Sequence, residues 1–465
     1  MTNTLPKKRP NDSSQSSTPA KKIQISADRN LFSTSPSTTS PKSISTPDAA
    51  TSTPTPSKPK LTQEDIFKRF RLRRVVRENH GRDVNHCVFF VKPGEQNSSA
   101  HQEESLAIGD GEVPATVDGS NVLATVGGAQ ANFYDNEHCG DHLDIMSHFV
   151  VGGEGYNGRP VSADPYELLT CCWLTMPNDA VLAASGTDNI IHILSIAQSK
   201  EQKPLSGHTG PIIDIASHPT DTNLLFSLSK DGSVRLWHVG AGRTLVVYDV
   251  KATALALHPY GTSFLTANTN GSVHDWDVPE DILNLPTEEA ESVEVEHVTE
   301  GVKVATASRL HGGSYVDSIR YIGDKVLSKS RDGKVLLWDP ESSQVTKLVM
   351  PLEQDGDEQD ADNGIQQVIQ KFTIKGGDDN RCRFDVTPDK KYFAIGNESG
   401  TVFIYNLSTG KLVTELRHKR CTKAVRCCAF SRNCRNLVFV GEDSFIWRFD
   451  YISDETLEKW KSSEQ

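Results

Sequence analysis

The stretch "SKDGSVRLW" (residues 229–237) joins a turn dipeptide, Asp231-Gly232, to an alternating run that ends in tryptophan. Asp231 stands six residues before Trp237, and the same offset joins a turn residue to a large apolar residue at six other places. These are Gly128 to Tyr134, Asp188 to Leu194, Asn270 to Trp276, Asp332 to Trp338, Ser399 to Tyr405 and Asp443 to Phe449. An apolar run precedes each turn, so each place predicts a β-hairpin.

The spacing of these hairpins predicts a repeated fold. Their last residues are separated by 60, 43, 39, 62, 67 and 44 residues. The short intervals match the period of about 40–45 residues in WD40 propeller blades. We therefore expect an all-β fold, a seven-bladed WD40 β-propeller over residues 61–465. The longer intervals predict insertions, and those at about 279–311 and 353–364 are acidic.

A propeller must close, because an open ring exposes two sheet edges. The last repeat, "AVRCCAFSRNCRNLVFVGEDSFIWRFD" (residues 424–450), contains three strand-like runs. We expect "RLRRVVR" (residues 71–77) to supply the missing outer strand, as a strap between the first and last blades. Residues 62–77 also fit a basic helix, and "TQED" (residues 62–65) offers a helix start that could lead into the strap.

The N-terminal segment differs from the rest in composition and charge. Ser, Thr and Pro fill 32 of residues 1–60, which buries too little apolar surface to order the chain, so we expect a disordered arm. Residues 1–77 carry 15 Lys and Arg against 5 Asp and Glu, whereas the remainder carries 34 against 56. An acidic body argues against nucleic-acid binding by the propeller and favours basic partners.

Several classes of site are not indicated by the sequence. The nine cysteines include no Cys-x-x-Cys pair, which favours reduced thiols packed in a core over a metal site. No apolar run is long enough for a membrane span, and no hydrophobic signal region opens the chain. No phosphate loop or nucleophile elbow is present. We expect no catalytic, cofactor or metal residues and no membrane partner.

Three blocks carry a resemblance to a known family. Residues 315–340, 207–237 and 429–450 are similar to blades of the Extra sex combs/EED family, WD40 subunits of Polycomb repressive complex 2. Weaker counterparts lie at 168–173 and 393–407, so the resemblance spans roughly residues 70–452. "YVDSIRYIGDKVLSKS" (residues 315–330) is far more specific than a generic WD40 signature. The divergence suggests a fast-evolving lineage, for which we suggest the nematode maternal-effect-sterile type.

The resemblance implies a non-catalytic scaffold of a histone H3 lysine-27 methyltransferase complex that supports transcriptional repression. Such a propeller binds a helix of the Enhancer-of-zeste-type SET-domain subunit on one face, alongside other Polycomb subunits. Its other face receives trimethyl-lysine peptides of the histone H3 tail in an aromatic cage. The resemblance also implies that His208, Asp231 and Trp237 join one buried hydrogen-bond network. We expect this network to be structural, and only this blade keeps the full set of residues.

The positions that correspond to the aromatic cage carry no aromatic residue here. They are Asn85, Leu169, Asn380 and Arg381. A shift of one or two residues in the alignment would offer Tyr166 or Phe90 as a wall instead. By contrast, Arg383 and Arg426 match arginines near the family's peptide pocket. We therefore hypothesise that the scaffold role persists while trimethyl-lysine reading is weak or lost.

The basic arm suggests nuclear import. "PKKRP" (residues 6–10) contributes Lys7, Lys8 and Arg9, and a second cluster follows at Lys21 and Lys22, a spacing typical of a bipartite signal. We expect a nuclear, chromatin-associated protein, although an ordinary solvated tail would have the same composition.

Two other classes of function compete with the scaffold. A WD40 substrate receptor of a cullin-type ubiquitin ligase often carries Trp-Asp-x-Arg at a blade end. The two Trp-Asp sites here continue as Val278-Pro279 and Pro340-Glu341, without the arginine. A propeller enzyme would need titratable groups at a catalytic spacing, and the sequence offers none.

Overall fold

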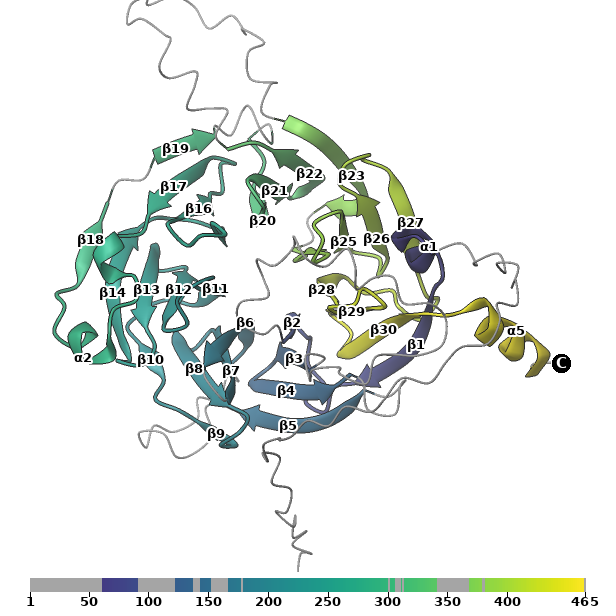
Figure 1. The fold of residues 1–465 in the computed structure, drawn as a ribbon, viewed down its shortest axis with the longest axis horizontal. Coiled ribbons are helices and arrows are strands. Elements are labelled where there is room, and N and C mark those ends of the chain that lie inside the picture. Colours follow the sequence, from purple (N-terminus) through teal and green to yellow (C-terminus); the bar gives the residue numbers. More distant parts are fainter. Residues whose placement is uncertain are drawn as a thin grey trace, which may run out of the picture. The chain divides into compact units, whose positions relative to one another are not determined.

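The computed structural model describes residues 61–90, 122–136, 143–151, 166–176, 179–299, 302–305, 311, 313–340, 368–378 and 381–463. Within these residues the chain forms seven sheets of four or five strands, arranged as the blades of a ring (Figure 1). The predicted seven-bladed, all-β propeller is thereby confirmed. The predicted arm (residues 1–60) and the insertion 353–364 lie outside the described residues.

Blades 1 to 4 follow one another along the chain. Blade 1 contains β2 (His86–Phe89), β3 (Val122–Gly127), β4 (Gln130–Asp135) and β5 (Asp144–Val150), and blade 2 contains β6 (Leu168–Met176), β7 (Asp179–Gly186), β8 (Ile190–Ser195), β9 (Lys200–Glu201) and β10 (Leu205–Ser206). Blade 3 contains β11 (Ile212–Ser217), β12 (Leu224–Ser229), β13 (Ser233–His238), β14 (Arg243–Asp249) and β18 (Glu296–Val298). Blade 4 contains β15 (Ala254–Leu257), β16 (Ser263–Ala267), β17 (Val273–Asp277) and β19 (Val302–Ala305).

Blades 5 to 7 complete the ring, and blade 7 takes its outer strand from the start of the described chain. Blade 5 contains β20 (Val316–Ile322), β21 (Lys325–Ser330), β22 (Asp332–Trp338) and β23 (Val368–Asp378). Blade 6 contains β24 (Asp385–Val386), β25 (Tyr392–Gly396), β26 (Val402–Asn406) and β27 (Leu412–Leu416). Blade 7 contains β28 (Val425–Phe430), β29 (Asn436–Gly441), β30 (Phe445–Tyr451) and β1 (Phe70–Arg77). Short helices are α1 (Gln63–Lys68), η1 (Glu280–Ile282), α2 (Thr287–Ala290) and α5 (Asp454–Ser463).

The six-residue offset follows from the turn between the second and third strands of a blade. In blade 3 the Asp231 Oδ1 atom accepts a hydrogen bond from the Ser233 backbone N–H at 3.0 Å, and Asn270 does the same for Ser272 in blade 4. Such side-chain bonds favour Asp or Asn at this position. The next residue has a left-handed backbone, with φ of +91° at Gly232, so glycine suits it. In blade 3 the third strand, β13, then places Trp237 four positions after it begins.

Continuous apolar runs form the strands because each blade is covered on both faces by its neighbours. Every residue of β12 is buried, for example. One core cluster joins Leu327 of blade 5, Phe393 of blade 6 and Trp447 of blade 7. The blades therefore share their cores instead of each enclosing its own.

The ring is closed by pairing between the two ends of the propeller. Strand β1 pairs antiparallel with β30, in a register that runs from Phe70 opposite Tyr451 to Arg77 opposite Phe445. The preceding α1 begins at a capping box, in which the Thr62 hydroxyl accepts a bond from the Asp65 N–H and the Asp65 carboxylate accepts one from the Thr62 N–H. Residues 62–77 thus form a short helix followed by a strand.

The insertion between β17 and β19, the third and fourth strands of blade 4, adds a strand to blade 3. Following η1 and α2, β18 pairs in parallel with β14 and becomes the fifth strand of that sheet. The Arg243 guanidinium donates to the backbone carbonyls of Glu291 and Val293, which fixes the returning chain. None of the helices in the described ranges could serve as a membrane span.

Blade 2 contains a histidine between two carboxylates. On β8, His192 Nε2 lies 2.6 Å from Asp188 Oδ2, and His192 Nδ1 lies 2.6 Å from Glu201 Oε1. Burial lowers the pKa of His192, but the bonds to Asp188 and Glu201 outweigh burial and raise the pKa to about 9. The imidazole is therefore a cation that joins the turn before β8 to the short strand β9.

We expect replacement of His192 by glutamine to destabilise the propeller more at low pH than at high pH. Because the folded pKa near 9 exceeds the unfolded value of 6.5, the stabilisation is fully present below pH 6.5 and is lost as the pH rises through about 9. A shift of this size corresponds to roughly 3 kcal/mol. Urea unfolding of the wild type and of His192→Gln, at about pH 6 and about pH 9.5, measures the difference in unfolding free energy between the two proteins at each pH. A difference in unfolding free energy that is the same at both pH values contradicts the prediction.

Candidate functional site

The structure joins His208, Asp231 and Trp237 in one network through Ser227, which the sequence analysis did not name. The Trp237 indole N–H donates to Ser227 Oγ at 2.7 Å, Ser227 Oγ lies 2.7 Å from His208 Nε2, and His208 Nδ1 lies 2.7 Å from Asp231 Oδ2. Since an indole N–H can only donate, Ser227 Oγ accepts from Trp237 and its hydroxyl hydrogen is donated to His208 Nε2. His208 therefore donates from Nδ1 to Asp231, and burial, its largest influence, lowers its pKa and favours the neutral ring.

Blade 5 contains a partial copy of this network, which the sequence analysis missed. His311 Nε2 lies 2.8 Å from Ser328 Oγ, and the Trp338 indole N–H donates to the same oxygen at 3.0 Å. The aspartate in this turn, Asp332, binds Ser330 and Lys334 instead of the histidine. The Gly-His order of blade 3 is absent here, because His311 precedes its glycine. The shared spacing of serine, aspartate and tryptophan was the available signal.

Blade 1 replaces the histidine with a buried carboxylate. Glu78, directly after β1, accepts hydrogen bonds from the Thr125 hydroxyl at 2.5 Å, the Tyr134 hydroxyl at 2.8 Å and the Asn132 amide. Thr125 and Tyr134 occupy the places that Ser227 and Trp237 hold in blade 3. Nothing in the local sequence distinguishes Glu78 from other acidic residues near a strand end. The side chains of these three networks hydrogen-bond to one another and hold the strands of their blades together.

Three of the predicted positions, Leu169, Arg381 and Arg383, lie together. They meet at β6 and β11, the first strands of blades 2 and 3, and both strands run near the middle of the ring (Figure 1). We call Leu169, Ile213, Asp214, Arg381 and Arg383 the central cluster. The Arg383 guanidinium donates to the Leu169 carbonyl at 3.3 Å and to the Ile213 carbonyl at 2.8 Å. Arg381 also donates to Ile213 O, at 3.2 Å. Two arginines from blade 6 thus reach across to blades 2 and 3.

The central cluster has an excess of positive charge. Asp214 Oδ1 lies 3.6 Å from Arg383 Nη2, and the guanidinium groups of Arg381 and Arg383 are close enough to repel each other. Burial lowers the pKa of Arg381, and the neighbouring Arg383 lowers it further, while Asp214 and Asp317 act in the opposite direction. The Arg383 side chain is 16% exposed. An approaching cation would therefore meet two largely desolvated positive charges.

The remaining predicted positions do not form a cage. The Asn85 amide donates to Glu167 Oε1 at 3.0 Å and to the Leu168 carbonyl at 2.8 Å, so it joins blade 1 to blade 2. Asn380 lies outside the described residues. Phe90, one of the two alternative walls, packs edge-on against Trp173 with ring centroids 5.1 Å apart. Arg426 Nη2 lies 2.5 Å from Glu442 Oε1 in blade 7, and Arg426 shares only a backbone hydrogen bond with Arg383.

The cysteines and other metal-binding residue types form no site in the described part of the chain. The eight cysteines there are free, and all except Cys172 are buried. No group of three or more His, Cys, Asp or Glu residues could hold a metal ion among the described residues.

A family model named "WD domain, G-beta repeat" matches residues 199–238, the blade that holds the complete network. The fold, the network and this match define a WD-repeat β-propeller protein. Curated relatives then narrow the class. The chain is 26% identical over 286 residues to Polycomb group protein FIE2 of Zea mays, a match that covers 58% of this chain and 71% of that protein.

Two further relatives have similar names. Polycomb group protein FIE1 of Oryza sativa subsp. japonica is 25% identical over 349 residues, covering 71% of this chain and 84% of that protein. Polycomb protein esc of Drosophila melanogaster is 25% identical over 307 residues, covering 62% and 70%. The chain is therefore a divergent relative of the Polycomb WD-repeat proteins, and the resemblance read from the sequence is confirmed.

A solved structure has the same fold. A chain of apo ctPRC2 in an autoinhibited state superposes with a TM-score of 0.58 and 14% identity, covering 82% of this chain and 98% of that chain. At this identity the likeness concerns the propeller fold alone.

Proposed function

We propose that this chain is the non-catalytic scaffold of a nuclear Polycomb complex that methylates lysine 27 of histone H3, and that it binds an Enhancer-of-zeste-type SET-domain subunit. The observation that carries the proposal is the match to Polycomb proteins over as many as 349 residues. The buried polar groups support a scaffold: His208, Asp231 and His192 hydrogen-bond within their blades, and Glu78, at the end of the closing strand β1, hydrogen-bonds to blade 1. Recognition would use the loops and rim of the ring.

Co-purification tests this proposal directly. We expect the full chain, expressed with an affinity tag, to retain a SET-domain methyltransferase. Omitting the chain from the reconstituted complex should lower methylation of histone H3 at lysine 27 by about tenfold or more, a loss of roughly 1.4 kcal/mol or more of transition-state stabilisation. A protein lacking residues 1–60 separates the arm from the propeller: nuclear import should fail while methylation in vitro persists. Retention of a cullin-type adaptor without a methyltransferase would contradict the proposal.

We further propose that the central cluster has lost trimethyl-lysine reading. A trimethylammonium group has no proton to donate, so its recognition depends on aromatic ring faces, each worth about 0.5–2 kcal/mol. Leu169, Asn85 and Arg381 offer no ring face. Arg381 and Arg383 instead place two positive charges at this position, held by the carbonyls of Leu169 and Ile213.

Calorimetric titration with a histone H3 peptide trimethylated at lysine 27 tests this loss. We expect no discrimination between the trimethylated and unmodified peptides, and a Kd of about 1 mM or weaker for both. Removing one charge by Arg381→Met should raise the affinity for the trimethylated peptide by less than about tenfold, because the ring faces remain absent. Micromolar binding that vanishes for the unmodified peptide would show that the cage function survives.

A further inference from the structure

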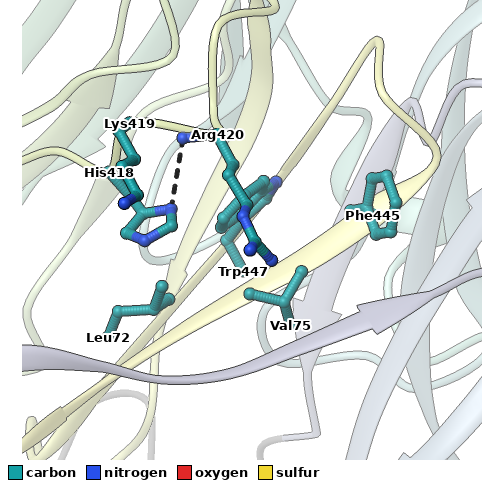
Figure 2. A pocket seen from close by; sticks show the side chains of 7 residues that line it. All are labelled: Leu72, Val75, His418, Lys419, Arg420, Phe445 and Trp447. Atoms are coloured by element: carbon teal, nitrogen blue, oxygen red, sulfur yellow. Dashed lines mark hydrogen bonds between the residues drawn. The ribbon is translucent and has the colours of Figure 1, made fainter.

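A groove of about 560 Å³ lies where the connection from β27 to β28 passes over β30 and the closing strand β1. Its floor is apolar and consists of Leu72 and Val75 from β1 with Phe445 and Trp447 from β30 (Figure 2). Val75 is directly opposite Trp447 in the β1–β30 register, so both side chains lie on the same face of the sheet. Val75 is 42% exposed, an unusual amount for a valine beside a core tryptophan. The floor therefore presents an apolar surface without a cover in the described part of the chain.

Hydrogen bonds and a ring contact fix both Trp447 of the floor and the loop that forms the wall. The Trp447 indole N–H donates to Asp443 Oδ2 at 2.7 Å, and the His418 ring lies 5.7 Å from the Trp447 ring. The Arg420 backbone N–H donates to His418 Nδ1 at 3.3 Å, the bond drawn in Figure 2. The Cys421 N–H bonds back to the His418 carbonyl at 3.0 Å. Because the loop is tied into a turn, little ordering entropy would be lost on binding.

The rim of the groove is basic. Lys419 and Arg420 line the groove from the loop "RHKRCTK" (residues 417–423) and are exposed. Arg417 is exposed beside them on the same loop, and Arg77 is exposed on β1 opposite Phe445. None of these four side chains forms an ion pair with a carboxylate among the described residues. The propeller as a whole is acidic, with 56 Asp and Glu against 34 Lys and Arg after residue 77. The groove is therefore a local reversal of charge around an apolar floor.

We propose that this groove binds a short acidic segment of a partner protein, with one bulky apolar side chain on Val75 and Leu72 and with carboxylates on Lys419, Arg420 and Arg77. Charge complementarity selects this partner, since unpaired cations on a rim favour anionic segments and steer their approach. A nucleic acid fits less well. Its phosphates would satisfy the rim but not the apolar floor, and Trp447, only 3% exposed, offers no free ring face on which a base could stack.

A selection experiment on the intact protein tests the proposal. Random dodecapeptides displayed on phage are selected on the full chain and counter-selected on a Val75→Glu, Arg420→Glu variant. Enriched peptides are then measured by fluorescence polarisation against the wild type and each single variant. Val150→Glu, at an apolar position 61% exposed on β5, and Lys251→Glu, at the corresponding connection between blades 3 and 4, are the matched controls. Thermal unfolding verifies that every variant is folded.

We expect the enriched peptides to combine several Asp or Glu residues with one Leu, Phe or Trp. Val75→Glu and Arg420→Glu should each weaken binding about tenfold, whereas the two control variants should change it by less than about twofold. Replacing the large apolar residue of the peptide by serine should abolish binding. The proposal is overturned if no enriched peptide binds the wild type more tightly than the Val75→Glu, Arg420→Glu variant, or if the enriched peptides are basic or neutral. It is also overturned if duplex DNA binds and loses affinity on Val75→Glu to the same extent. Self-association, or binding of a peptide that copies residues 353–364 in preference to the selected ones, would assign the groove to this chain instead.

Discussion

Replacing Phe67 by alanine is expected to lower the free energy of unfolding by about 3–5 kcal/mol, as for other buried phenylalanines. Phe67 of α1 is fully buried and contacts three rings: Phe70 at 5.4 Å, Tyr392 at 5.1 Å and Phe430 at 5.7 Å between centroids. These rings belong to β1, blade 6 and blade 7. The substitution therefore leaves a cavity at the point where the closing strand meets the two last blades.

Urea unfolding followed by tryptophan fluorescence measures this effect. Leu61→Ala, on the same segment but 41% exposed, is the matched control and should change stability by no more than about 0.5 kcal/mol. If Phe67→Ala prevents folding, Phe67→Leu keeps most of the volume and should give a smaller, measurable loss. Equal effects of Phe67→Ala and Leu61→Ala would show that α1 does not hold the ring closed.

Replacing Lys329 by methionine should cost about 3–5 kcal/mol, because it leaves the Asp317 carboxylate buried without its partner. Lys329 Nζ lies 2.8 Å from Asp317 Oδ2 between β21 and β20, and the two side chains are 0% and 4% exposed. Burial raises the pKa of Asp317, and Lys329 acts to lower it. Without the lysine that pKa rises further, so the variant should lose stability as the pH increases.

The double variant Lys329→Met with Asp317→Leu separates the ion pair from the stranded charge. It should recover most of the lost stability, because an apolar pair of similar volume is often as stable as a buried salt bridge. Lys325→Met is the surface control: its ion pairs with Asp324 and Asp339 are partly exposed and should be worth less than about 1 kcal/mol. Thermal unfolding at about pH 5 and about pH 8 compares all four proteins. A double variant no better than Lys329→Met would mean that packing, not charge, explains the loss.

The fold could be predicted because its repeat unit is local. The unit is an aspartate or asparagine that hydrogen-bonds to the backbone two residues later, followed by a residue with a left-handed backbone and then a buried strand. It needs only a few neighbouring residues, and it recurs in the sequence. The left-handed position is glycine in most blades, yet Asn189 and Ser444 fill it in blades 2 and 7. The turn geometry therefore persists where the sequence signature has weakened.

The candidate site was less predictable because its contacts are not local. Arg383 reaches the carbonyls of Leu169 and Ile213, which lie 214 and 170 residues away in the chain. Backbone carbonyls have no sequence signature, so no pattern announces such an acceptor. Glu78 and His311 were missed for a related reason: each replaces or shifts a residue of the blade network, and only packing reveals the equivalence.

The pairing of β1 with β30 has a consequence for biosynthesis. A ribosome releases residues 70–77 long before residues 445–451, so the first strand waits unpaired until nearly the entire chain has emerged. Joining segments so far apart costs roughly 5 kcal/mol of chain entropy, which the final contacts must offset at once. Cotranslational folding should therefore give an incomplete ring first, with an unpaired sheet edge at each end. Chaperones that cover these two edges would then determine how much of the protein reaches the folded state.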